Sequence, residues 1–226
     1  MQVATGSFRG GDAVGLRERK KQRTRDALVD AALDLFLTRG YEATTVEQIA
    51  AEVDVSSRTF FRYFASKEDA ALSLTAEEQE MFLAELVTRP ESESPFTALS
   101  QSMRAMLGIL RELDEAETGR IVKARRLIHS TPSLLAGGMR LVRENERRLV
   151  AEVARRMGVP PDDLQPQFVV SLFVGIGLLC LDGPTEDLGD MARRYEDLLT
   201  LAERSLRPGW DLPVRPGTAG VVPPPR

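Results

Sequence analysis

Residues 44–70 read TTVEQIAAEVDVSSRTFFRYFASKEDA, and this stretch carries the clearest structural signal in the chain. Thr44 offers an N-cap oxygen and Glu47 follows three residues later, which is the capping-box pattern of a helix start. Ser56 is placed to cap a further short helix that runs to about Phe64, after a tight turn. Two short helices joined by a tight turn predict a helix-turn-helix unit.

The segments on either side add two more helices. Before this stretch, an apolar stripe at three- and four-residue spacing predicts a helix from about Arg17, which Gly40 ends. After its second short helix, Ser66 and Asp69 form another capping pattern, which opens a fourth helix through about Val87. The stripe consists of Leu28, Ala31, Ala32, Leu35 and Phe36.

The remaining sequence predicts an all-α protein of about nine helices, with no convincing strand. Five further helices are expected at about 96–110, 116–130, 132–157, 164–181 and 186–206. We divide the chain into a disordered leader (residues 1–15), a helix-turn-helix domain (16–65), a larger helical domain (66–207) and a disordered Pro-rich tail (208–226).

Composition favours a protein of the reducing cytoplasm. The single cysteine, Cys180, leaves no internal disulfide to form. The longest apolar stretch, Phe168 to Leu181, is shorter than the roughly 20 residues that a membrane-spanning helix needs. The N-terminus lacks the apolar core of a secretory signal. We therefore expect a cytoplasmic, nucleoid-associated protein with no membrane partner.

Charge is distributed unevenly along the chain, whose net charge is −4. Between Arg17 and Arg25 there are six basic residues and one acidic residue, Glu18. Residues 68–226 carry 19 basic and 25 acidic residues. Although such a run is often only a solvated helix end, this asymmetry predicts a basic arm on an acidic body, as in proteins that bind nucleic acid.

Catalysis has little support in the sequence. Cys180 lies in an apolar helix with no histidine nearby in the sequence, and His129 is the only histidine. A nucleophile paired with a base, or a histidine metal cluster, is therefore not indicated. We expect neither an enzyme nor a cofactor.

Residues 44–70, together with LVDAALDLFLTRGYEA at 28–43, resemble the helix-turn-helix of TetR-family transcriptional regulators of the TetR/AcrR type. The resemblance covers about residues 20–72. It combines the apolar stripe, the Gly-Tyr turn, the Thr-Thr cap and the Thr-Phe-Phe-Arg-Tyr-Phe core at matching intervals. It implies a homodimer that binds double-stranded operator DNA, with residues 66–207 forming a ligand-binding and dimerisation domain.

The second short helix should present one face to DNA. At about 100° per residue, Phe60 and Phe64 fall together on the inward side, which leaves Ser57, Arg58 and Arg62 pointing outward with Phe61. A guanidinium can bond guanine bidentately, so Arg58 is the first candidate for base recognition. By resemblance, Thr45, Thr59, Tyr63 and Lys67 lie beside phosphates. The expected DNA-binding set is Thr44, Thr45, Ser56, Ser57, Arg58, Thr59, Phe61, Arg62, Tyr63, Lys67, Arg23 and Arg25.

Two positions depart from the pattern of the family. Asp54 stands in the turn where such units usually have glycine, and aspartate tolerates positive φ better than most residues. Phe61 stands where many members have tyrosine, so a phosphate contact there is in doubt, although the ring could pack on a thymine methyl group.

The sequence predicts less about the larger helical domain. The resemblance implies that the last two helices pair with their copies, with Leu172, Phe173, Ile176, Leu179, Tyr195, Leu198 and Leu199 as interface candidates. Packing in the protomer core is the alternative for that apolar helix. A ligand pocket is expected among Met103, Met106, Leu107, Leu110, Leu127, Ile128 and Leu141, for which ordinary core packing is again the alternative.

These features predict a dimeric repressor that an unidentified small hydrophobic effector releases from its operator. A ligand-dependent activator of the same fold is an open alternative, because the direction of control depends on which state binds DNA better. A helical interaction adaptor with a vestigial DNA-binding head is a further alternative.

Overall fold

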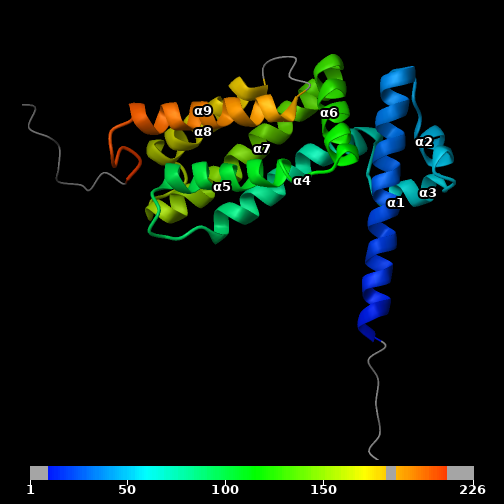
Figure 1. The fold of residues 1–226 in the computed structure, drawn as a ribbon, viewed down its shortest axis with the longest axis horizontal. Coiled ribbons are helices and arrows are strands. Elements are labelled where there is room, and N and C mark those ends of the chain that lie inside the picture. The colour runs from blue at the N-terminus through cyan, green and yellow to red at the C-terminus, as the bar shows by residue number, and fades with distance from the viewer. Residues whose placement is uncertain (1–9, 182–186, 213–226) are drawn as a thin grey trace, which may run out of the picture. The chain divides into compact units, whose positions relative to one another are not determined.

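The computed structural model describes residues 10–181 and 187–212, and within these ranges the chain forms nine α-helices and no strand (Figure 1). In chain order these are α1 (Gly10–Arg39), α2 (Val46–Glu52), α3 (Ser57–Phe61), α4 (Lys67–Thr88), α5 (Pro95–Leu110), α6 (Glu115–Ser130), α7 (Pro132–Met157), α8 (Leu164–Leu181) and α9 (Leu188–Ser205). The predicted all-α fold is confirmed. In the described part of the chain, no helix has the length and apolar character needed to cross a membrane.

The helices pack into two compact units. Unit 1 comprises the chain up to Thr75 together with Gly119–Gly138, and unit 2 comprises Ala76–Thr118 together with the chain from Met139 onward. Unit 1 therefore holds α1, α2, α3, the start of α4 and the joint between α6 and α7. Unit 2 holds α5, α8, α9 and the remaining parts of α4, α6 and α7. Each unit is built from two separate stretches of the sequence.

The core of unit 1 uses the stripe that the sequence predicts on α1. All five stripe residues, Leu28, Ala31, Ala32, Leu35 and Phe36, are buried. The helix ends at Arg39, and Gly40 has a φ of +92°, a left-handed conformation that glycine adopts without steric cost. The second stretch of the unit contributes Ala124 and Leu127 from α6 and Leu134 from α7, all buried.

Ion pairs join α6 to α1 inside unit 1. Arg120 donates through two nitrogens to the carboxylate of Asp30, at 2.6 and 2.8 Å. Lys123 donates to Asp34 at 2.6 Å. A bidentate guanidinium–carboxylate pair fixes orientation as well as distance. The two pairs therefore set the register of α6 on α1.

The first helix begins earlier than the sequence predicts. Helix α1 starts at Gly10 instead of near Arg17, so residues 10–15 of the expected disordered leader are helical. Extending a helix that is already nucleated adds one hydrogen bond for each residue fixed, so a Gly-rich segment can join it. Residues 1–9 of that leader lie outside the described residues.

The start of the expected disordered tail is also ordered. The ring of Trp210 lies 5.4 Å from that of Phe96 and 5.9 Å from that of Phe168. Asp211 is 2 % exposed, and its carboxylate accepts a hydrogen bond from the Phe96 backbone amide at 2.8 Å. Asp211 thus satisfies a free amide at the start of α5, a role that Pro- and Gly-rich composition does not reveal. Residues 213–226 lie outside the described part of the chain.

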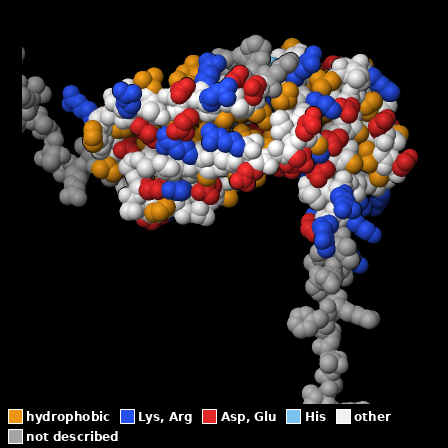
Figure 2. Space-filling model, in the orientation of Figure 1, with side chains coloured by type: hydrophobic (Ala, Val, Ile, Leu, Met, Phe, Trp, Pro, Cys, Tyr) orange, Lys and Arg blue, Asp and Glu red, His pale blue; other side chains and the backbone are white. Residues whose placement is uncertain are grey.

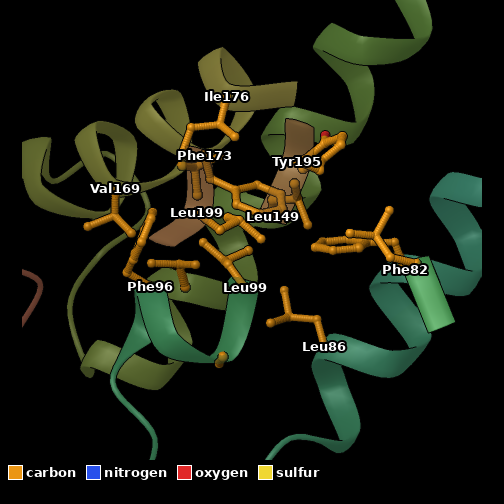
Figure 3. Packing of buried hydrophobic residues seen from close by; sticks show 14 of the residues in the cluster. Phe82, Leu86, Phe96, Leu99, Leu149, Val169, Phe173, Ile176, Tyr195 and Leu199 are labelled. Carbon is orange, nitrogen blue, oxygen red and sulfur yellow. The ribbon is translucent and has the colours of Figure 1, made fainter. Parts of the chain in front are cut away.

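The core of unit 2 gathers side chains from α4, α5, α7, α8 and α9 (Figure 3). The rings of Phe82 and Phe173 stack at 5.3 Å, and Leu99, Leu149 and Leu199 are almost completely buried beside them. Four of the expected interface residues, Phe173, Ile176, Tyr195 and Leu199, belong to this core. The protomer's own core thus accounts for these four side chains. For Phe173 and Ile176 the sequence does not show this, because α8 is apolar on almost every side and does not reveal which face its own protomer covers.

The expected pocket residues do not form one group. Leu127 and Ile128 belong to unit 1, whereas the other five belong to unit 2. Leu107 lies in the unit 2 core, and Met103, Met106 and Leu110 pack against it. Leu127 lines an open hollow of about 720 Å³ in unit 1, between the end of α1 and the α6–α7 joint. Core packing therefore accounts for Leu107.

Candidate nucleic-acid interface

Helix α2 begins one residue later than the sequence predicts. Its N-cap is Thr45, whose hydroxyl accepts a hydrogen bond from the Gln48 amide at 3.3 Å, while the Gln48 side chain accepts one from the Thr45 amide at 2.9 Å. Thr44 is buried, and its hydroxyl donates to the Gly40 carbonyl at 2.9 Å. Thr44 and Thr45 fit the capping pattern equally well. The Thr44 side chain is buried in the turn after α1, so Thr45 is the residue that caps α2. Thr44 is therefore a structural residue, and its side chain is removed from the expected DNA contacts.

The turn between α2 and α3 has positive φ at Asp54, the conformation that aspartate was expected to tolerate. Asp54 has a φ of +53°, in the left-handed region, and it is exposed to solvent. The following amide, of Val55, donates back to the Ala50 carbonyl at 3.0 Å. The turn is therefore hydrogen-bonded and tight without glycine, and it holds α3 against α2.

Helix α3 is a five-residue helix whose start was correctly predicted and whose end was not. Ser56 caps it by accepting a hydrogen bond from the Thr59 amide at 3.2 Å. The α-helix ends at Phe61, and residues 62 and 63 continue as a turn. Phe60 and Phe64 are 0 % and 2 % exposed, with their rings 5.4 Å apart, which confirms their inward placement.

The opposite side of α3 faces solvent. Arg58, Phe61 and Arg62 are exposed, whereas Ser57 and Thr59 are half-buried. The Arg62 guanidinium lies 5.1 Å from the centre of the Tyr63 ring and donates to its hydroxyl at 3.4 Å. Two guanidinium groups and an apolar ring thus share one outward surface of a short helix, which has the size to enter a major groove.

Basic residues continue along α1. Figure 2 shows Lys and Arg side chains gathered over the described N-terminal part of this helix. Arg23 is exposed, and the Arg25 guanidinium lies 5.1 Å from the centre of the buried Phe64 ring. The positive potential of the interface therefore extends from α3 onto α1 within unit 1.

Lys67 has a different role from the one expected. Its ammonium group donates to the carbonyls of Tyr41, Glu42 and Thr44, at 2.8, 3.3 and 3.2 Å. It also lies 4.4 Å from the centre of the Tyr41 ring. An ammonium group has three protons, and all are directed at this turn. In this structure Lys67 therefore ties the turn after α1 to the start of α4, and its expected phosphate contact stays a prediction.

Tyr41 is held firmly within the same cluster. Its ring meets that of Phe36 at 5.0 Å in an edge-to-face arrangement. Burial raises the pKa of the Tyr41 phenol to about 12, and the negative charges of Glu68 and Glu42 add to the effect. The Tyr41 phenol therefore stays neutral over the whole physiological pH range.

Replacing Lys67 with methionine is expected to lower the unfolding free energy of unit 1. The substitution leaves three carbonyl groups without their charged donor, and each unsatisfied buried polar group costs about 1–3 kcal/mol. Because two of these contacts are only partly buried and the third is exposed, we expect a total near the lower end. Chemical denaturation followed by circular dichroism measures the change. Lys21→Met is the matched control, since Lys21 is 63 % exposed and pairs only with Glu18 in the described contacts. Equal stability of both variants would contradict the assignment.

Comparisons with known proteins agree with this geometry. Residues 28–74 match the family model of the bacterial regulatory proteins of the tetR family, and residues 93–211 match that of the MftR C-terminal domain. The transcriptional regulator TcmR of Streptomyces glaucescens is 48 % identical over 166 residues, covering 72 % of this chain and 74 % of TcmR. The regulator MftR of Mycobacterium tuberculosis is 31 % identical over 160 residues, covering 71 % of this chain and 79 % of MftR.

A solved structure shows the same fold. SmeT, the repressor of the Stenotrophomonas maltophilia multidrug efflux pump SmeDEF, has a TM-score of 0.54 at 21 % identity, covering 88 % of this chain and 97 % of SmeT. The matched family regions contain both the helix-turn-helix with its outward cationic face and most of unit 2. Shared sequence, fold and surface chemistry thus lead to one conclusion: the chain is a DNA-binding transcriptional regulator of the TetR family, and not an enzyme.

Proposed function

We propose that this regulator is a dimeric repressor, released from its operator when a small hydrophobic ligand binds the helical domain over residues 66–207. The observation that carries the dimer is an exposed apolar stripe along α8. Leu164 is 81 % exposed, Phe168 61 % and Leu179 51 %. Large apolar side chains exposed along one side of a helix favour association, because a second copy removes them from water.

The stripe follows helical geometry. Leu164, Phe168, Ser171 and Gly175 recur at four, three and four residues, which places them on one side of α8, followed by Leu178. A Cβ atom built on Gly175 would meet nothing within 4 Å, as expected on an open face. Leu201, at 60 % exposed, adds a residue from α9, which packs beside α8 (Figure 1). Of the interface residues expected from the sequence, Leu172, Leu179 and Leu198 retain exposed or half-buried side chains.

For DNA, we propose the outward face of α3 as the base-reading surface. Arg58 bonds a guanine in the major groove, with Ser57 and Arg62 as secondary contacts. Thr45, Ser56, Thr59 and Tyr63 lie beside phosphates, although the hydroxyls of Ser56 and Thr59 already share a hydrogen bond of 3.1 Å. Arg23 and Arg25 on α1 extend the phosphate contacts, and counterion release makes binding steeply dependent on salt.

Two buried polar atoms support a ligand site in unit 2. Among the described residues, the Ser100 hydroxyl and the Asn145 amide oxygen are buried without a hydrogen-bond partner. Ser100 lies on α5 and is 0 % exposed. A buried polar group without a partner costs about 1–3 kcal/mol of folding free energy. A ligand that forms a hydrogen bond with such a group would recover this free energy as binding affinity. The ligand is thus largely apolar, with one or two polar groups.

The DNA contacts are tested by replacing Arg58 with alanine. Duplexes selected by the wild-type protein from a random-core library serve as the operator. Loss of a bidentate guanine contact costs about 1–3 kcal/mol, so we expect about 5- to 150-fold weaker binding with relaxed preference at one base pair. Arg143→Ala is the control, because Arg143 lies on α7 with its side chain 74 % exposed. Unchanged operator binding by Arg58→Ala would favour the interaction-adaptor alternative.

The dimer is tested by placing charge on the stripe. Leu164→Glu combined with Phe168→Glu should convert the dimer to a monomer in sedimentation equilibrium, because two carboxylates would be buried at the interface. Ile109→Glu introduces the same charge at a residue of α5 that is 48 % exposed, and it should leave the assembly unchanged. A monomeric wild-type protein at micromolar concentration would refute the proposal.

The direction of control is tested by transcription in vitro from a promoter that overlaps the selected operator. A repressor lowers the transcript yield in the absence of effector, and an apolar extract of cell metabolites restores it. A yield that rises only when extract is added would identify the ligand-dependent activator instead. The two outcomes differ in sign because each depends on which conformational state the effector binds better.

A further inference from the structure

Phe61 is a large apolar side chain on the surface that faces DNA. It is 54 % exposed and is the last residue of α3. Its ring meets the buried Phe60 ring edge-to-face at 5.6 Å, so one edge is anchored while the rest faces solvent. Arg58 and Arg62 are exposed beside it, so an apolar group of bound DNA that covers this ring would remove apolar surface from water on both molecules.

We propose that Phe61 is a specificity-determining residue that packs on the 5-methyl group of a thymine in each operator half-site. This inference rests on the proposed function, in which α3 enters the major groove. A phenyl ring has no donor or acceptor, so it cannot bond a phosphate or a polar base edge. The thymine methyl group is the apolar feature that the major groove displays. Phe61 therefore distinguishes thymine by removing its methyl group from water.

The position of Phe61 relative to Arg58 sets where this thymine lies. Residues three apart are neighbours on one helix face, so both side chains reach the same groove. Along the helix axis they are separated by about 4.5 Å, given a rise of about 1.5 Å per residue. Base pairs follow one another at about 3.4 Å. The thymine therefore lies within about two base pairs of the guanine that Arg58 contacts.

Tyr63 can make the phosphate contact that the phenyl ring of Phe61 cannot make. Its phenol is the hydroxyl-bearing aromatic group near α3, and it accepts a hydrogen bond from Arg62 at 3.4 Å. A backbone contact by an aromatic hydroxyl can thus be made from position 63. The phenyl ring at position 61 is left for base recognition through shape and apolar contact.

Uracil substitution tests the inference directly. In the duplex selected by the wild-type protein, each thymine of one half-site is replaced singly by uracil, which removes only the methyl group. At one position we expect wild-type affinity to fall about fourfold, the factor that corresponds to burying one methyl group. Phe61→Ala should bind the thymine and uracil duplexes equally at that position. Phe61→Leu, which keeps an apolar side chain, should retain part of the preference for thymine.

Controls separate this inference from the proposed interface. Ile109→Ala removes an exposed apolar side chain from α5 and should keep the full preference for thymine. If Phe61→Ala also keeps that preference, or loses affinity equally for every duplex, the inference is overturned while recognition by α3 stands. If Arg58→Ala binds the operator as well as wild type does, the interface itself fails and the inference fails with it.

Discussion

Replacing Phe64 with alanine is expected to cost unit 1 about 3–5 kcal/mol of unfolding free energy, the range measured when large buried aromatic rings are removed. Phe64 is 2 % exposed and packs at 5.4 Å against Phe60, which is completely buried. Its ring also carries the Arg25 guanidinium at 5.1 Å. Since α2 and α3 are only seven and five residues long, they cannot persist without this packing.

The single tryptophan makes this loss measurable unit by unit. Trp210 belongs to unit 2, so its fluorescence reports on that unit, whereas circular dichroism reports on helices in both. Phe64→Ala should lose part of its helical signal at low denaturant while Trp210 emission stays native. Phe61→Ala is the matched control, because Phe61 is 54 % exposed and its removal should change stability by less than about 0.5 kcal/mol. Equal stability of the two variants would refute the inward placement of Phe64.

Replacing Arg156 with methionine is expected to destabilise unit 2 by about 3 kcal/mol or more, as when one partner of a buried ion pair is removed. Arg156 has a side chain that is 2 % exposed. Its guanidinium donates to Glu152 at 3.0 Å and to the carbonyls of Leu86, Arg89 and Pro90 at 2.6, 2.9 and 3.2 Å. The Leu86 carbonyl lies in the last turn of α4 and the other two carbonyls follow the helix, and all three would lose this charged donor.

Arg155 is the natural comparison for this change. It pairs with the same Glu152 and with Glu91, but its side chain is 52 % exposed. The pKa of Glu152 is held below its usual range, chiefly by hydrogen bonds from Arg155, so the carboxylate remains charged when Arg156 is absent. Arg155→Met should cost about 1 kcal/mol or less. Urea unfolding followed by Trp210 emission measures both variants, and a larger loss for Arg155→Met would reverse the assignment.

Local signals explain why most of the fold is predictable from the sequence. Helix α7 begins at Pro132 and ends at Met157 as expected, because Thr131, Pro132 and Gly158 act on their immediate neighbours. The inward and outward sides of α3 follow from helical spacing alone. In contrast, the Thr44 and Thr45 registers of α2 satisfy the same local rule, and only burial of the Thr44 hydroxyl decides between them.

Contacts between residues that are far apart in the chain account for the features that the sequence does not predict. Lys67 bonds a turn that lies 23 to 26 residues earlier, and Asp211 bonds an amide 115 residues away. No window of local sequence contains both partners of such a contact. On α8, local sequence likewise does not show which face the protomer covers: Phe173 and Ile176 are as apolar as Leu164 and Phe168, and only the position of α5 and α9 distinguishes the two pairs.

The discontinuous make-up of unit 1 limits how such regulators can be recombined. A chimaera that exchanged only the residues up to Thr75 would leave Arg120 and Lys123 facing a foreign α1, although their aspartates lie about 90 residues earlier in the native chain. Leu127 and Leu134 would likewise meet an unmatched surface. A chimaera designed to transfer operator specificity should therefore include residues 119–138 from the same donor protein. Among related regulators, substitutions in the one stretch should therefore be accompanied by matching substitutions in the other.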